Sequence, residues 1–144
     1  MSKQGFSEFE KQAMKERAQE LRRDASQKKN PLADLLEKIA AMPEDEAYLA
    51  AQLHELVQQN APPQLQPKTW YGMPAYANQE GKVVLFFQPA TKFKARYSTL
   101  GFNDSALLDM GGKMWPTAYA LCSWDADIAR QVAVLIRKAV TEKA

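Results

Sequence analysis

The sequence predicts an α+β domain in which an antiparallel sheet of about five strands packs against helices, with an extra helix at the N-terminus. Residues 7–60 carry apolar side chains at helical spacing, whereas residues 68–122 contain short segments rich in aromatic and β-branched residues. The links between these short segments are also short, which favours antiparallel pairing of consecutive strands. An amphipathic segment near the C-terminus predicts one more helix.

The first helix is predicted to begin at Ser7, which forms a capping-box pair with Glu10, and to run to about Lys28. Such a helix can lie on a domain or on a partner, but its narrow apolar stripe cannot form a core alone. We therefore expect it to dock on the rest of the chain, on a partner or on a second copy, which leaves a monomer and a homodimer open. The stripe consists of Phe9, Ala13, Met14, Ala18, Leu21 and Ala25.

Four further helices follow from local signals. Asn30 and Pro31 combine a capping side chain with a proline at the first helical position, so the second helix is predicted to begin there. Residues 44–60 form the third, with leucines on one face and acidic residues in the first turn. A short helix is predicted over 103–112, and the C-terminal helix is marked by apolar positions between 128 and 139.

The strands are predicted between turn signals. Glu80-Gly81 indicates a tight hairpin, and the continuously apolar VVLFF predicts a central strand covered on both faces. The preceding APPQLQP, residues 61–67, is expected to be extended. The predicted strands are KTWY (68–71), PAYAN (74–78), KVVLFFQ (82–88), KFKARYSTL (92–100) and TAYALC (117–122).

Composition and charge restrict the possible partners. Residues 1–30 contain eight Lys or Arg and five Asp or Glu, while residues 31–144 contain eleven and twelve. We therefore predict a charged helical extension over 1–30, a domain over 31–144 and no nucleic-acid partner, since nucleic-acid-binding domains usually show a larger basic excess. Because the chain has one cysteine and no apolar segment long enough for a secretion signal or membrane span, we expect a cytoplasmic protein without a membrane partner.

The segment WYGMPAYA, residues 70–77, holds the densest group of large side chains. Gly72 and Pro74 indicate a turn. The aromatic residues around it predict either one wall of a small-molecule pocket or a hairpin whose aromatics fill the core. The candidate ligand-binding residues here are Trp70, Tyr71, Met73 and Tyr76.

Two other segments carry cations. If residues 92–98 form a strand, their alternation places Lys92, Lys94, Arg96 and Ser98 on one face and Phe93, Ala95 and Tyr97 on the other. The cationic row predicts an anionic ligand or a solvated edge strand. Lys113 and Trp115 follow Gly111-Gly112, whose backbone N–H groups either bind an anion or simply form a turn.

No sequence pattern assigns a reaction, metal or cofactor. The dinucleotide, phosphate-loop, nucleophile-elbow and HExxH patterns do not occur. His54, the only histidine, lacks neighbours at zinc-ligand spacing and is predicted to lie at the surface. Cys122 is predicted to be a small buried residue. We predict no cofactor and no catalytic residue, and enzymatic activity is left unassigned.

Taken in order, these segments resemble the YdhG-like family, a bacterial domain of unknown function. The resemblance covers about residues 32–140 through IAAMPEDEAYLAAQLHELVQQNAP, WYGMPAYA, GKVVLFFQ, KFKARYSTLGF and MWPTAYAL. It implies a mixed α/β domain with an antiparallel sheet, and the N-terminal helix resembles an extension seen in some members. Some relatives are described as frataxin-like iron chaperones. Iron would need oxygen ligands, for which Glu44-Asp45-Glu46 is the nearest cluster.

Three functions follow from these patterns. The first is a ligand-binding module, in which aromatic residues line an apolar pocket and cations meet an anionic group. The second is the iron chaperone implied by the resemblance, and the third is an interaction module that uses the N-terminal helix. The proposed ligand pocket combines Trp70, Tyr71, Met73, Tyr76, Tyr97 and Trp115 with Lys94, Arg96 and Lys113.

Overall fold

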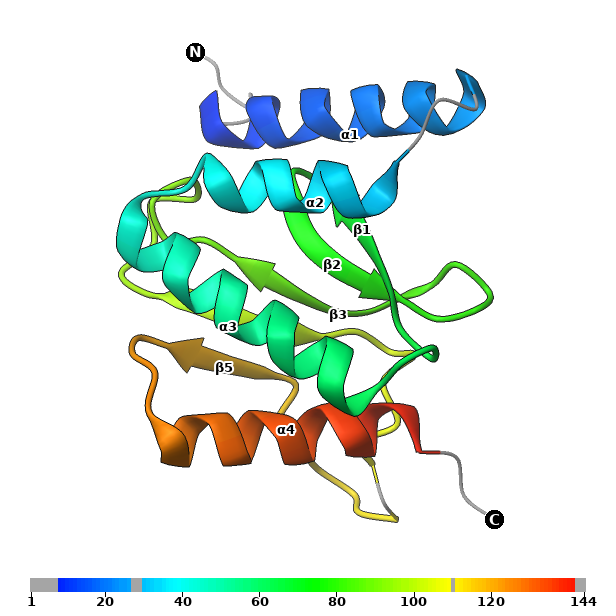
Figure 1. The fold of residues 1–144 in the computed structure, drawn as a ribbon, viewed down its shortest axis with the longest axis vertical. Helices are drawn as coiled ribbons and strands as arrows, with labels where there is room; N and C mark the ends of the chain where they lie inside the picture. Colours follow the sequence, from blue (N-terminus) through cyan, green and yellow to red (C-terminus); the bar gives the residue numbers. More distant parts are fainter. Residues whose placement is uncertain (1–7, 27–29, 110, 142–144) are drawn as a thin grey trace.

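The computed structural model describes residues 8–26, 30–109 and 111–141, and it confirms the predicted α+β class. It contains four described helices and a five-stranded sheet (Figure 1). None of the described helices is both long and apolar enough to cross a membrane. The elements are α1 (Glu8–Ser26), α2 (Pro31–Ala40), α3 (Glu44–Asn60), β1 (Gln66–Trp70), β2 (Met73–Ala77), β3 (Val83–Gln88), β4 (Ser98–Phe102), β5 (Ala118–Leu121) and α4 (Ala126–Val140).

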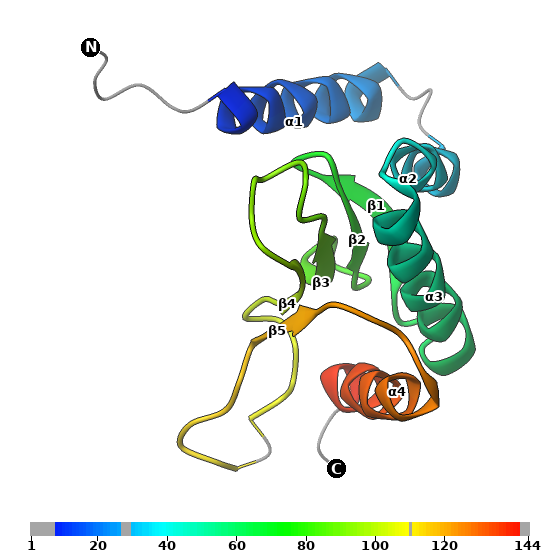
Figure 2. The same cartoon turned by 90° about the vertical axis from the view of Figure 1, so that its left-hand side faces the viewer.

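The sheet is an antiparallel meander in which every strand pairs with its neighbour in the chain, in the order β1-β2-β3-β4-β5. The central strand, β3, pairs Leu85 with Phe102 of β4 and with Tyr76 of β2. One face of the sheet is covered by α2, α3 and α4, while α1 lies beyond the β1 edge (Figure 2). Helices therefore do not cover much of the opposite face of the sheet, beside which loops lie.

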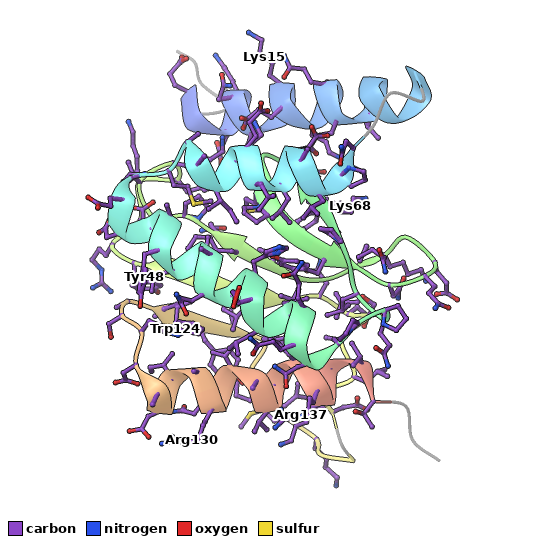
Figure 3. All side chains as sticks on the ribbon, in the orientation of Figure 1. Lys15, Tyr48, Lys68, Trp124, Arg130 and Arg137 are labelled. Carbon is purple, nitrogen blue, oxygen red and sulfur yellow. The ribbon has the colours of Figure 1, made fainter. Side chains whose placement is uncertain are left out.

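The core lies between the sheet and the three covering helices, where side chains fill the interior (Figure 3). Leu35 of α2, Leu53 of α3 and Ile136 of α4 are each completely buried. Phe87 meets them from β3 and is also completely buried. Each such side chain contributes about 1.5–3 kcal/mol on leaving water, so this layer holds the scaffold on which the surface sites are built.

The predicted starts of α2 and α3 are confirmed. The Asn30 side chain accepts a hydrogen bond from the Ala33 N–H at 3.2 Å, and Pro31 occupies the first turn. Asp125 caps α4 in the same way through the Ile128 N–H at 2.8 Å. The predicted cap Ser7 lies outside the described residues. These caps supply acceptors for N–H groups that have no partner within the helix.

The prediction of a strand over residues 92–100 is wrong for its first six residues. They form a turn, in which the Ala95 N–H donates to the Ala90 carbonyl at 2.9 Å and Lys94 has a φ of 55°. The strand begins only at Ser98. The predicted alternation, with Lys92, Lys94 and Arg96 on one face of a strand, is therefore wrong, because a turn does not keep the two-residue period on which it depends.

Two other local predictions are wrong. The described residues between 103 and 112 form turns rather than a helix, because the Leu107 N–H donates to the Ala139 carbonyl at the end of α4 (2.8 Å). Residues 61–64 form a turn after α3 rather than an extended segment, with a cis bond between Pro62 and Pro63. The extended backbone starts with β1 at Gln66.

Candidate functional site

A two-residue turn, Tyr71-Gly72, joins β1 to β2 and organises the surrounding surface. Trp70 and Met73 pair across it, and the two turn residues have φ values of 53° and 77°. Positive φ at both positions is the type I′ geometry that matches the twist of a hairpin. Glycine adopts it freely, whereas a residue with a Cβ pays about 1–2 kcal/mol. Tyr71 offsets this cost through its ring, which lies 5.2 Å from Trp70 and 5.7 Å from the Arg17 guanidinium carbon.

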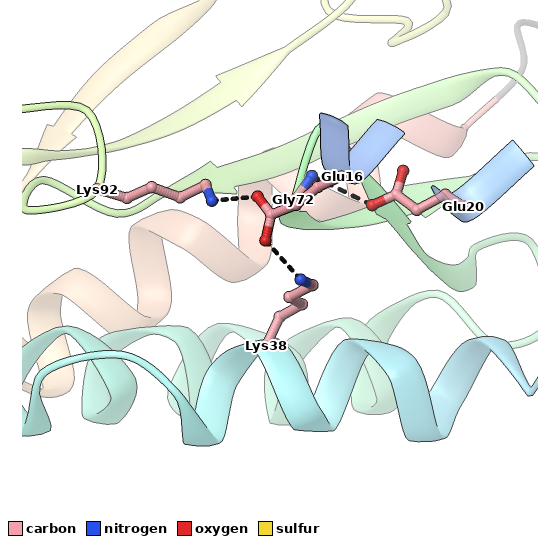
Figure 4. A network of polar contacts seen from close by, with 5 residues as sticks. All are labelled: Glu16, Glu20, Lys38, Gly72 and Lys92. Atoms are coloured by element: carbon pink, nitrogen blue, oxygen red, sulfur yellow. Dashed lines mark hydrogen bonds and ion pairs between the residues drawn. The ribbon is translucent and has the colours of Figure 1, made fainter. Parts of the chain in front are cut away.

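Helix α1 docks on this turn through carboxylates (Figure 4). The Gly72 N–H donates to the Glu20 carboxylate at 3.1 Å. The Glu16 carboxylate accepts from Lys38 of α2 at 2.6 Å and from Lys92 of the turn before β4. A Cβ at position 72 would displace the Glu16 carboxylate, and the positive φ there also favours glycine. The structure thus docks α1 on its own domain, one of the three options predicted.

Glu16 is the electrostatic centre of this contact, with a side chain only 12% exposed. Burial, the largest single effect, disfavours its charged form, but the hydrogen bonds and positive charges of Lys38 and Lys92 together outweigh it. The pKa of the Glu16 carboxyl is therefore lowered from its ordinary value. The carboxylate stays ionised at neutral pH and joins α1, α2 and the turn before β4.

A cavity of about 570 Å³, which we call the cationic pocket, lies beside this contact. Three cations line it: Arg17 from α1, Lys68 from β1 and Lys82 from the start of β3. Arg17 pairs with Glu20 at 3.5 Å, whereas the amines of Lys68 and Lys82 make no ion pair within the described part of the chain. The rest of the lining is Trp70, Asn78, Glu80, Gly81, Val83, Asn103, Asp104, Ser105 and Leu107.

Local structure positions two of these cations. Lys68 and Trp70 are two residues apart on β1, so both project from the same face of the sheet. Lys82 follows the β2–β3 turn, in which the Asn78 side chain accepts from the Lys82 backbone N–H at 3.0 Å. Gly81 adopts a φ of 84° there, which confirms the tight hairpin predicted at this point.

A second cavity of about 400 Å³, the apolar groove, separates α1 from the same face of the sheet. The Trp70 ring lies 5.3 Å from the Phe86 ring, which covers the backbone of Gly101 so closely that a Cβ at Gly101 would collide with it. The groove shares Trp70 with the cationic pocket. Its lining is Glu10, Ala13, Met14, Trp70, Tyr71, Met73, Phe86, Gln88 and Phe93.

The structure brings together three of the nine predicted ligand-binding residues, since Trp70, Tyr71 and Met73 all line the apolar groove. The other six line neither this groove nor the cationic pocket. Tyr76 is out of phase with Met73 on β2 and projects from the opposite face.

The remaining five predicted residues lie in two loops. Lys94, Arg96 and Tyr97 lie in the turn before β4, where the Arg96 guanidinium carbon is 5.3 Å from the Tyr97 ring. Lys113 and Trp115 lie in the exposed segment before β5. Their role as ligand contacts stays a prediction.

Sequence reasoning missed Arg17, Lys68 and Lys82. The spacing of Lys68 and Trp70 in KTW was a usable signal, because residues two apart share a face of a strand. Lys82 directly follows a turn signal, but only the folded hairpin shows which residues it approaches. Nothing local indicates Arg17, which reaches the pocket because α1 folds back onto the β1–β2 turn.

The predicted burial of two reactive residues, His54 and Cys122, is wrong. His54 is buried rather than at the surface, because Nδ1 of its ring hydrogen-bonds to the Tyr76 hydroxyl at 2.8 Å. Burial lowers the pKa of His54 and raises that of Tyr76, while the nearby Glu55 charge opposes the shift of His54. Cys122 is exposed rather than buried, because it lies just beyond Leu121, the last residue of β5.

Acidification is expected to destabilise the fold through His54. Because the folded-state pKa of His54 lies below its ordinary value of 6.5, the unfolded chain binds the proton first as the pH falls. The contribution is fully present above about pH 6.5 and is lost as the pH falls toward the folded pKa. Urea unfolding of wild type and His54→Gln between about pH 7.5 and 5 measures it, because the variant lacks this titration. An NMR titration of this single histidine that gave a pKa above 6.5 would contradict the sign.

Comparison with known proteins adds no relative. No protein-family model, no curated protein and no solved structure matches the chain. Within the described ranges, no group of three or more His, Cys, Asp or Glu side chains could hold a metal ion. The site is therefore defined by this chain's own geometry, with Trp70 between a cationic and an apolar cavity.

Proposed function

We propose that this protein binds a small anionic molecule that carries an apolar or aromatic portion. The observation that carries the proposal is that Trp70 lines both cavities. An anionic group in the cationic pocket would lie beside the apolar groove, which accepts the rest of the ligand. Both volumes fall within the range of about 300–1,000 Å³ that is typical of small-molecule sites.

The charges of the cationic pocket favour an anion. Its lining has three cations against two carboxylates, those of Glu80 and Asp104, so its formal charge is +1. A hydrogen bond from a charged donor contributes about 1.5–3 kcal/mol. The amines of Lys68 and Lys82 have no carboxylate partner among the described residues, so an anion gains their interaction without breaking an existing ion pair.

The apolar groove supports the second half of the proposal. Trp70 and Phe86 present aromatic surface, while Met73 supplies an adaptable thioether. Stacking on the indole would orient a flat ligand toward the lysines. The ligand class is the one expected from the sequence, but these cations differ from Lys94, Arg96 and Lys113.

Calorimetry with 1-naphthyl phosphate as the probe tests this function. We expect Lys68→Gln and Lys82→Gln each to weaken binding about 5- to 30-fold, which corresponds to about 1–2 kcal/mol. Lys113→Gln is the matched control and should leave the affinity unchanged. The neutral analogue 1-naphthol and inorganic phosphate should each bind more weakly than the combined molecule.

Two results would overturn the proposal. One is the absence of measurable binding of naphthyl phosphate to the wild-type chain. The other is equal affinity in Lys68→Gln, Lys82→Gln and wild type. If Lys113→Gln were instead the sensitive variant, the anion would bind at the loop before β5. Melting temperatures of all variants separate loss of binding from loss of folding.

A further inference from the structure

A third cavity, of about 520 Å³, lies on the helix-covered side of the molecule, and we call it the Tyr76 pocket. It is bounded by the start of α2, by α3 and by the Pro62-Pro63 turn, with Leu32, Val57 and Leu65 among its apolar walls. His54 and Tyr76 also line it. Every other lining side chain is proline, aliphatic or a neutral amide, so the lining carries no formally charged residue.

The hydrogen bond between His54 and Tyr76 fixes the direction of its proton. Tyr76 is 1% exposed, and within the described chain its hydroxyl bonds only to Nδ1 of His54, at 2.8 Å. If Nδ1 were the donor, the buried tyrosine proton would have no acceptor, at a cost of about 1–3 kcal/mol. The hydroxyl therefore donates to Nδ1. In the neutral ring the remaining proton is then on Nε2.

The Nε2–H group of His54 is free to donate to a molecule in the Tyr76 pocket, which His54 lines. Nε2 of His54 has no hydrogen-bond partner among the described residues. Every buried side-chain nitrogen or oxygen of those residues does have a partner, so Nε2 is not a buried atom. Nε2 must therefore be accessible to solvent, and His54 lines this cavity. Burial lowers the pKa of the ring, which keeps it neutral near pH 7. The pocket thus presents a neutral imidazole donor within a mainly apolar wall that also holds the amides of Asn30, Gln58 and Gln66.

We propose that the Tyr76 pocket binds a neutral, largely apolar small molecule whose carbonyl oxygen accepts a hydrogen bond from His54 Nε2–H. A carboxylate would lose hydration there without a cation among the lining residues. A pure hydrocarbon would leave the donor unpaired and desolvated. This site is separate from the proposed anion site, because Tyr76 and Trp70 project from opposite faces of the sheet.

NMR of the His54 ring tests the site, because the chain has one histidine and its ring signals are unambiguous. The probes are acetophenone, ethylbenzene of similar shape without an acceptor, and benzoate, which adds a charge. We expect acetophenone to shift the ring signals saturably and to bind at least about 5-fold more tightly than either of the others. Long-range ¹H–¹⁵N correlations should show the proton on Nε2.

Tyr76→Phe should weaken acetophenone binding about 3- to 10-fold, because Nδ1 loses the donor that fixes the tautomer. Tyr119→Phe is the matched control, since it removes a hydroxyl from a half-buried tyrosine elsewhere in the sheet. Absence of a saturable shift with acetophenone overturns the proposal, as does equal or tighter binding of ethylbenzene or benzoate. These wild-type measurements remain decisive if Tyr76→Phe fails to fold.

Discussion

Replacing Glu16 with glutamine is expected to release α1 from the domain. The wild-type carboxylate holds Lys38 and Lys92, whose side chains are only 29% and 22% exposed. A neutral amide would leave two partly buried ammonium groups without their counter-charge. Loss of a buried pair costs about 3–5 kcal/mol and loss of an exposed one at most about 1, so we expect about 2–3 kcal/mol. Most of the stability of a helix in a protein comes from tertiary packing, so released α1 should also lose helicity.

Hydrogen exchange of the α1 amides measures this release. Glu8→Gln is the matched control, because it makes the same change on the same helix at a side chain that is 92% exposed. Only Glu16→Gln should lose protection across α1, and it should also bind naphthyl phosphate more weakly because Arg17 leaves the cationic pocket. Equal protection in the two variants would show that Glu16 does not hold the helix.

Much of the helical layer could be predicted because its signals are local. Asn30 lies three residues before the N–H that it caps, and Pro31 needs no partner for its missing N–H. Asp125 acts in the same way at α4. A cap is a short-range contact that the sequence displays directly, and so the start of α2 predicted at Asn30 and Pro31 agrees with the structure.

The wrong strand over 92–97 has a long-range cause. KFKARY has the aromatic and alternating composition of a strand, but the preceding Thr91 donates to Glu46, forty-five residues earlier. This anchor and the positive φ of Lys94 turn the chain before β4 begins. The predicted helix over 103–112 failed for a similar reason, since the Leu107 N–H is used by α4. Composition cannot reveal partners that are distant in sequence.

In the candidate site, too, local contacts could be predicted and contacts between distant segments could not. Trp70, Tyr71 and Met73 meet because the hairpin that joins them is local. Arg17 and the pair of His54 with Tyr76 depend on how α1 and α3 pack against the sheet. The sequence pattern grouped Trp70, Tyr71 and Met73, whereas the positions of the donors and cations that line each cavity required tertiary structure.

Glu46→Ala should destabilise the fold by about 2–3 kcal/mol, because a buried acceptor is removed from two donors. Glu46 is 7% exposed. Its carboxylate accepts from the Thr91 N–H at 3.3 Å and from the Thr91 hydroxyl at 2.5 Å. Alanine leaves the Thr91 groups without this acceptor. Urea unfolding at neutral pH measures the loss. Glu44→Ala, an exposed change in the same helical turn, should stay within about 0.5 kcal/mol of wild type.

A double-mutant cycle with Thr91→Val separates this contact from general effects of the substitution. If the contact is the cause, the two changes together should cost less than the sum of the single changes, by at least about 1 kcal/mol. Full additivity would show that Glu46 stabilises α3 by another route. Because the turn that Thr91 starts also supplies Lys92 to Glu16 and Phe93 to the apolar groove, Glu46→Ala should in addition loosen α1 and weaken naphthyl phosphate binding.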